Sequence, residues 1–147
     1  MKTLFSTITL ILIATISFAQ TAESLKERIQ EHYKAIHSGD LDAIKSHHLD
    51  DFSMFFGDNT TLFESGFEET YEKMGSEQVY PVPNVTMKHF STQIYGNVGI
   101  ALFYLEGTFD SVPKIKRVTA IWVWNKGEWK EAHHHESELK KLTKYNK

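Results

Sequence analysis

Cysteine is absent from the 147-residue sequence, and this absence excludes disulfides, thiolate metal sites and cysteine nucleophiles together. It also suits an oxidising compartment, where an unpaired thiol is a liability. No basic cluster is present either, because the lysines near the C-terminus follow directly on Glu136 and Glu138. With a formal net charge of −3, the chain lacks the positive surface that nucleic-acid binding requires. We therefore expect no nucleic-acid partner.

The one long apolar run is at the N-terminus, and it is shorter than the ~20 residues that a membrane-spanning helix needs. Lys2 precedes the run from Leu4 to Phe18, and Ala19 follows it as a small residue. This pattern is typical of a secretory signal peptide at residues 1–19. We expect a periplasmic or secreted protein that has no membrane contact after cleavage, with one mature domain at 20–147. An uncleaved membrane anchor is the alternative.

The pattern of the mature chain separates helices from strands. Ser24 to Glu27 has the form of a capping box, and Gly39 is suited to end the helix that follows. Asp40 is expected to cap a second, short helix. Strand patterns follow at 52–56, 85–90, 97–109, 114–124 and 129–136, with a helical stretch at 67–74. Helices segregated from a run of antiparallel strands indicate an α+β fold.

The last predicted strand carries the most chemistry. Alternate side chains of a strand share a face. One face of this strand would therefore hold Trp129, Glu131, His133, His135 and Ser137. A face with a ring, a carboxylate, two imidazoles and a hydroxyl either lines a polar pocket or faces water. His134, on the opposite face, is expected to point to solvent or to a dimer surface.

Motifs near the C-terminus point to a known family. The chain reads Arg-Val-Thr-Ala-Ile-Trp from Arg117, then Gly-x-Trp-Lys from Gly127, then His-x-His-x-Ser from His133. This order resembles the C-terminal signature of SnoaL-like (DUF4440-type) proteins in the NTF2-like superfamily, and the Ser-Gly-Asp-Leu-Asp-Ala-Ile joint at 38–44 resembles the family's first helix pair. The resemblance implies a cystatin-like cone, in which a curved antiparallel sheet wraps around N-terminal helices and encloses a deep pocket. It also implies a homodimer formed through the sheet.

The resemblance and the strand pattern together predict a small-molecule binding protein. A small, partly apolar ligand would lie between the helices and the concave sheet. Polar contacts would come from Tyr33, His133 and His135, and Trp122 or Phe55 would pack against the ligand. No cofactor is expected.

Metal binding is an alternative interpretation of the histidines. His133 and His135 could both face one ion, but a metal site needs three or four converging ligands. The other candidates are Glu131, His32, His47 and His48, and none of them stands at a recognised metal-binding spacing. The sequence therefore predicts no metal site.

Catalysis is the main alternative to binding. Ketosteroid isomerase shares the implied fold, and alignment on the Gly39-Asp40 joint places its aspartate base on Phe56 and its oxyanion-hole tyrosine on His32. Phenylalanine cannot accept a proton, so no complete catalytic set is predicted. A hydrolase, isomerase or dehydratase would instead use His135 as its general base, beside Glu131 or Glu64. A non-catalytic oligomerisation domain is the third possibility.

Overall fold

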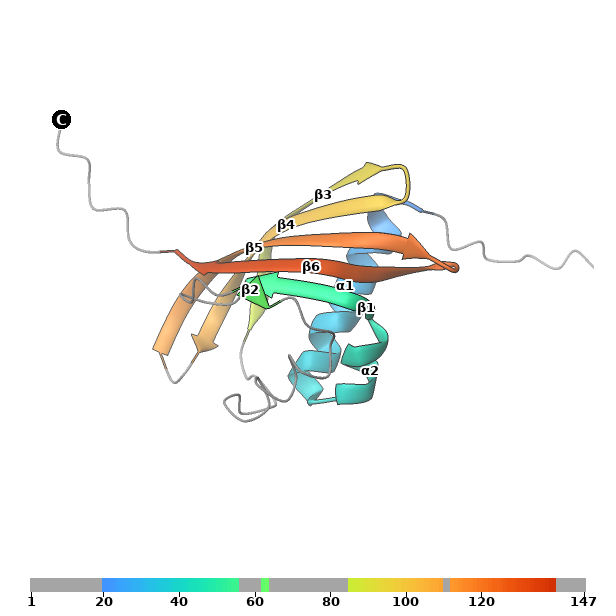
Figure 1. Cartoon of the computed structure of the whole chain (residues 1–147). Helices are drawn as coiled ribbons and strands as arrows, with labels where there is room; N and C mark the ends of the chain where they lie inside the picture. The colour runs from blue at the N-terminus through green and yellow to red at the C-terminus, as the bar shows by residue number, and fades with distance from the viewer. Residues whose placement is uncertain (1–19, 56–61, 64–84, 110–111, 140–147) are drawn as a thin grey trace, which may run out of the picture.

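The computed structural model describes residues 20–55, 62–63, 85–109 and 112–139 (Figure 1). Its elements are α1 (Ala22–Ser38), α2 (Leu41–Ser46), β1 (His48–Phe55), β2 (Leu62–Phe63), β3 (Thr86–Tyr95), β4 (Val98–Phe109), β5 (Val112–Asn125) and β6 (Glu128–Glu138). The predicted signal peptide and the helix predicted at 67–74 lie outside the described residues. Among the described helices, none is long and apolar enough to cross a membrane.

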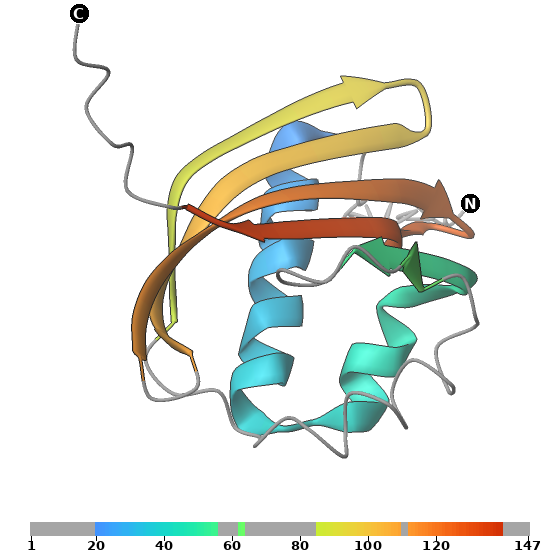
Figure 2. The same cartoon turned by 60° about the vertical axis from the view of Figure 1, so that its left-hand side comes forward.

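All six strands join one sheet in the order β2-β1-β6-β5-β4-β3. β1 pairs with β6 in parallel, and every other neighbouring pair is antiparallel. The long strands bend over α1, which lies inside the curve of the sheet (Figure 2). We call the side of the sheet that faces α1 the inner face and the other side the outer face. The predicted α+β fold, with a curved sheet around N-terminal helices, is confirmed.

Local signals set the ends of both helices. The N-cap of α1 is Thr21, whose side chain accepts a hydrogen bond from the Ser24 backbone N at 3.1 Å. Ser24 is thus the closing residue of the capping box, and the prediction that the box begins at Ser24 was wrong by one turn. Gly39 ends the helix as predicted, with a left-handed φ of 70°. Asp40 caps α2 as predicted, by accepting from the Ala43 backbone N at 3.0 Å.

The apolar core lies between α1 and the inner face of the sheet. Its buried members are Leu25, Ile29, Ala101, Phe103, Leu105, Val118, Ala120, Trp122 and Trp129. A Cβ atom placed on Gly99 would overlap Cδ2 of Leu25. The missing side chain at Gly99 therefore lets α1 pack directly on β4.

One irregularity in β6 decides which of its residues point inward. Ile121 of β5 pairs with His133, whereas the next residue, Trp122, pairs with Glu131. Ala132 is therefore an extra residue in β6, which is the definition of a β-bulge.

The bulge reverses the side-chain alternation that the sequence predicts for the second half of β6. Glu131 before the bulge is buried, and so are His134 and Glu136 after it. His133 is half-buried and His135 is exposed. The prediction that both of them share a face with Trp129 was wrong, because strict alternation holds only in a strand without an inserted residue.

Candidate functional site

Ionisable side chains gather on the inner face of the sheet, in surroundings that are otherwise apolar. Seven of them form what we call the inner polar cluster: His32, His47, His48, Lys116, Glu131, His134 and Glu136. They come from α1, from the α2–β1 junction, from β5 and from β6. Residues of these types are seldom buried without partners, so the contacts between them are informative.

Glu131 is the centre of the inner polar cluster, with a side-chain exposure of 2%. Its Oε2 atom lies 3.0 Å from Nε2 of His48 and 3.6 Å from Nε2 of His32. Its Oε1 atom lies 2.9 Å from Nδ1 of His134. Both carboxylate oxygens therefore have histidine partners: Oε2 faces His48 and His32, and Oε1 faces His134.

Contacts extend from this centre in two directions. His134 Nε2 lies 3.7 Å from Oε2 of Glu136, and Glu136 forms a close ion pair with Lys116. On the other side, Nδ1 of His32 lies 3.3 Å from Nδ1 of His47, so one of these two nitrogens donates to the other. The cluster is thus a continuous chain of polar contacts from α2 to β5.

The protonation states follow from burial and from these contacts. Burial alone would raise the pKa of Glu131, but the charge and hydrogen bond of His134 hold it well below its usual range. Burial alone would lower the pKa of His134, but the Glu131 carboxylate beside it raises it to about 10. Burial lowers the pKa of His32 well below its usual value, against the pull of Glu131. A carboxylate and an imidazolium therefore lie beside a neutral imidazole.

Aromatic side chains form a wall next to the inner polar cluster. The Tyr33 ring stands edge-on to Phe103 at a centroid distance of 5.6 Å, and the His32 ring stands edge-on to Trp122 at 5.8 Å. Burial raises the pKa of Tyr33 well above its usual value, so its hydroxyl is protonated. Trp122 is fully buried, and within the described structure its Nε1 has no hydrogen-bond partner. Such an unsatisfied buried donor costs about 1–3 kcal/mol.

The structure separates the residues that were predicted to bind a ligand together. Tyr33 and Trp122 lie at the inner face, as expected. Phe55, His133 and His135 lie at the outer face, where the Phe55 ring contacts both imidazoles at centroid distances of 5.8 and 5.6 Å. The predicted set therefore does not line one pocket, and His134 takes the interior position that was assigned to its neighbours.

His135 is also badly placed for the role of general base. It is exposed on the outer face, whereas Glu131 is buried on the inner face and hydrogen-bonded to His134. Glu131 therefore cannot orient the His135 ring. Glu64 and Phe56, the other residues in the catalytic predictions, lie outside the described residues.

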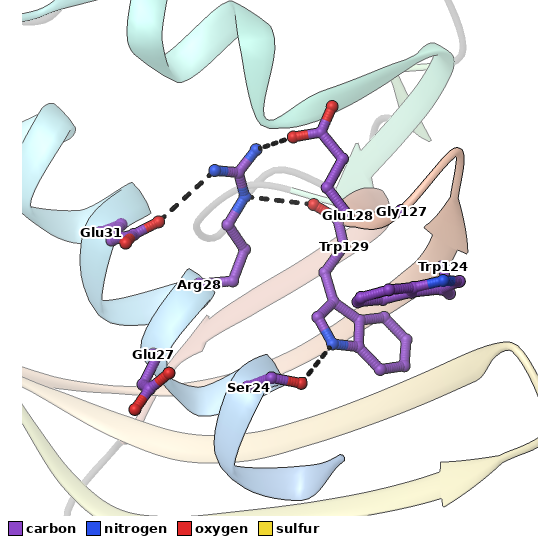
Figure 3. Close-up of a pocket in the computed structure, with 8 residues that line it drawn as sticks. All are labelled: Ser24, Glu27, Arg28, Glu31, Trp124, Gly127, Glu128 and Trp129. Carbon is purple, nitrogen blue, oxygen red and sulfur yellow. Dashed lines mark hydrogen bonds and ion pairs between the residues drawn. The ribbon is translucent and has the colours of Figure 1, made fainter. Parts of the chain in front are cut away.

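A separate cleft of about 290 Å³ lies between α1 and the hairpin that joins β5 to β6 (Figure 3). It is lined by Ser24, Glu27, Arg28, Glu31, Trp124, Gly127, Glu128 and Trp129. Arg28 donates to Glu128 Oε2 at 2.7 Å and to the Trp129 carbonyl at 3.2 Å, and Trp129 Nε1 donates to Ser24 Oγ at 3.0 Å. These bonds tie α1 to the hairpin, which gives Ser24, Arg28 and Glu128 a structural role.

Sequence reasoning missed part of the inner polar cluster. It considered His32, His47, His48 and Glu131 as metal ligands but rejected them, because no spacing linked them. It did not place Lys116 or Glu136 in the interior at all. His134 and Glu136 carry no local sequence signal of burial, since their inward direction depends on the bulge in β6. Lys116 faces inward by the regular alternation of β5, which places it on the same side as Trp122.

The comparisons with known proteins agree with the fold described above. A model of the SnoaL-like domain family matches residues 25–140, and no curated protein matches the chain. An NTF2-like protein from Cytophaga hutchinsonii has a TM-score of 0.72 at 12% identity, over 82% of this chain and 100% of that one. A candidate ketosteroid isomerase from Parabacteroides distasonis has a TM-score of 0.65 at 22% identity, over 78% and 86%.

The hub domain of S. rosetta CaMKII is a third similar structure. Its TM-score is 0.67 at 22% identity, over 82% of this chain and 98% of that one. At such identities the solved structures show a shared fold and nothing about activity.

Proposed function

Since the chain belongs to the SnoaL-like domain family and has an NTF2-like fold, we propose that it is an exported protein that binds a small, partly apolar molecule inside the cone. The ligand would lie against the inner face of the sheet, beside the inner polar cluster and the Tyr33 ring. The observation that carries this proposal is the inner polar cluster beside an aromatic wall.

Stability alone does not account for the inner polar cluster. Replacing buried ion pairs by apolar side chains of similar volume is often neutral or stabilising, so a purely structural role predicts an apolar interior. Strongly perturbed pKa values gather at functional sites more often than elsewhere. Glu131, His134, His32 and Tyr33 all have such values.

The chemistry of the site suggests what kind of ligand fits. Tyr33 and Phe103 offer apolar ring surface, and the Trp122 N–H offers a donor that nothing in the described structure uses. A ligand with a hydrogen-bond acceptor and an apolar body would satisfy both. The sequence predicted that His133 and His135 make the polar contacts with the ligand. In the present proposal, residues of the inner face make them instead.

The test begins with whatever co-purifies with the mature chain, identified by native mass spectrometry. Its affinity is then measured by thermal shift for two variants. Trp122→Phe removes the N–H and keeps a ring, and we expect about tenfold weaker binding, because one hydrogen bond of about 1–1.5 kcal/mol is lost. His135→Ala on the outer face is the matched control and should bind as the wild type does. Weaker binding in His135→Ala alone would contradict the proposed site.

Export has a test of its own. The full-length chain, expressed in a host with a secretory pathway, should appear outside the cytoplasm with Gln20 as its first residue. The measurement is intact-mass spectrometry of the exported fraction. A full-length protein that stays in the cytoplasm would contradict export and leave the binding proposal standing.

We also propose a homo-oligomer, most simply a dimer, formed through the outer face of the sheet. Leu102 on this face is 39% exposed, and Ile121 and Phe55 on the same side are half-buried. The similarity to a hub domain supports such an assembly. Light scattering after size exclusion should give a dimer mass for the wild type and a monomer mass for Leu102→Asp. A monomeric wild type would refute this part.

A further inference from the structure

We propose that His32, His48 and Glu131 form a binding site for a divalent transition-metal ion of the Zn²⁺ type. The ligand atoms would be Nε2 of each histidine and Oε2 of the glutamate. This inference goes beyond the proposed function, because the ion would bind whether or not an organic molecule enters the cone.

The spacing of the three atoms fits a single ion. One donor atom from each residue lies within 4.8 Å of the other two, and the carboxylate oxygen lies 3.0 Å from His48 and 3.6 Å from His32. Tetrahedral ligands at zinc bond lengths of about 2.0–2.1 Å lie roughly 3.3 Å apart. The two carboxylate–histidine distances are already close to this value, so only the two histidine nitrogens, which lie within 4.8 Å of each other, would have to move closer to enclose an ion.

The donor set is the right one chemically. Two imidazoles and one carboxylate form a recurrent three-ligand arrangement of catalytic zinc sites, in which a fourth position stays open. Imidazole nitrogen suits zinc, copper and iron better than magnesium or calcium. The chain has no cysteine to offer a competing thiolate site.

The surrounding side chains already hold these ligands in a suitable direction. His47 contacts His32 through Nδ1 of both rings, which leaves Nε2 of His32 toward Glu131. His134 engages Oε1 of Glu131, which leaves Oε2 toward the two histidines. Ligating histidines and carboxylates are commonly fixed by such partners on their far side.

The three ligands come from separate elements of the fold. His32 lies on α1, His48 starts β1 and Glu131 is on β6, where its residue pair in the parallel ladder is His48 itself. All three side chains have exposures of 2–6%, so an ion there would be shielded from water. The arrangement is built by the parallel pairing of β1 with β6 and not by a short sequence motif.

The test uses the mature protein after treatment with a chelator and dialysis. Calorimetric titration with Zn²⁺ should show one ion per chain, and native mass spectrometry should show the matching mass increase. In His48→Gln, which keeps much of the side-chain volume, we expect affinity to fall at least about 100-fold, since a ligand is lost. In His47→Ala we expect about a tenfold loss, because only the partner of a ligand is removed.

Surface histidines are the obvious adventitious site, so the matched control is the double variant His133→Ala/His135→Ala. It should bind Zn²⁺ as the wild type does. No binding to the wild type would overturn the inference, as would binding that survives His48→Gln and disappears in the control. A folded wild type that binds its co-purified molecule but not Zn²⁺ would keep the proposed function and remove the metal site. Circular dichroism of each variant shows that it is folded.

Discussion

His133 and His134 are neighbours in the sequence, yet they lie on opposite faces of the sheet. On the outer face, Nδ1 of His133 hydrogen-bonds Oγ of Ser53 at 2.8 Å, and burial and the nearby His134 lower its pKa. On the inner face, His134 is held between two carboxylates and its pKa is about 10. The face of the sheet, and not the residue type, decides what each imidazole does.

The largest difference between the two faces is expected when one imidazole is removed from each. His134→Ala should lower the free energy of unfolding by about 3–5 kcal/mol, because it leaves buried carboxylates without their cation. In the monomer, His135→Ala should change it by no more than about 0.5 kcal/mol, as expected for an exposed position. Urea unfolding in the presence of a chelator measures both. Equal effects of the two variants would show that the faces do not differ.

A pH titration sharpens the same contrast without removing a side chain. The folded-state pKa of His134 is about 10, above the usual 6.5, so its contribution to stability is complete below pH 6.5 and is lost as pH rises toward 10. The loss should be smaller than in His134→Ala, since a neutral imidazole can still donate one hydrogen bond. The measurement is unfolding free energy against pH with chelator present. His134→Gln is the control, and its profile should lack this decline.

Packing gives a third comparison between the faces, this time on β4. Gly99→Ala on the inner face should cost about 1–3 kcal/mol, because the added methyl overlaps Leu25. Leu102→Ala on the outer face should cost less than about 1 kcal/mol in the monomer, since the side chain is already 39% exposed. Thermal unfolding at low protein concentration compares the two. A harmless Gly99→Ala would mean that α1 does not rest directly on β4.

The smallest expected effect is on an outer-face polar contact. Ser53→Ala removes the hydroxyl that His133 contacts, and we expect a loss of about 0.5–1 kcal/mol. The imidazole left behind can turn to water, so no buried group is stranded. Chemical unfolding resolves a change of this size when the two proteins are measured side by side. A loss above about 3 kcal/mol would place His133 in the interior after all.

Much of the fold follows from local signals in the sequence. Gly39 and Asp40 mark the joint between the helices because a left-handed residue and a side-chain acceptor are needed there. β4, β5 and β6 were predicted within a few residues of their ends, from turn residues and β-branched runs, whereas β3 was predicted to end at Phe90 and continues to Tyr95. The start of α1 was placed too late, since Thr21 and Ser24 form a capping box without the usual acidic partner.

The site could not be predicted in the same way. The bulge at Ala132 has no glycine or proline to announce it, and a one-residue error in a strand exchanges its two faces. His32, His48 and Glu131 are brought together by pairing between distant segments. The sequence therefore showed that metal-binding residue types were present, but it did not show that these three lie close together.

The run of three histidines has a consequence for how β6 finds its place. If β6 shifted by one residue against its neighbouring strands, one histidine would replace another at the middle of the run. The three histidines therefore contribute almost nothing to fixing the register of β6. The register must be fixed at the flanks, where Trp129 reaches Ser24 on one side and Glu136 reaches Lys116 on the other. The contacts at the two ends of β6 therefore set the register of the whole strand, including the three histidines at its centre.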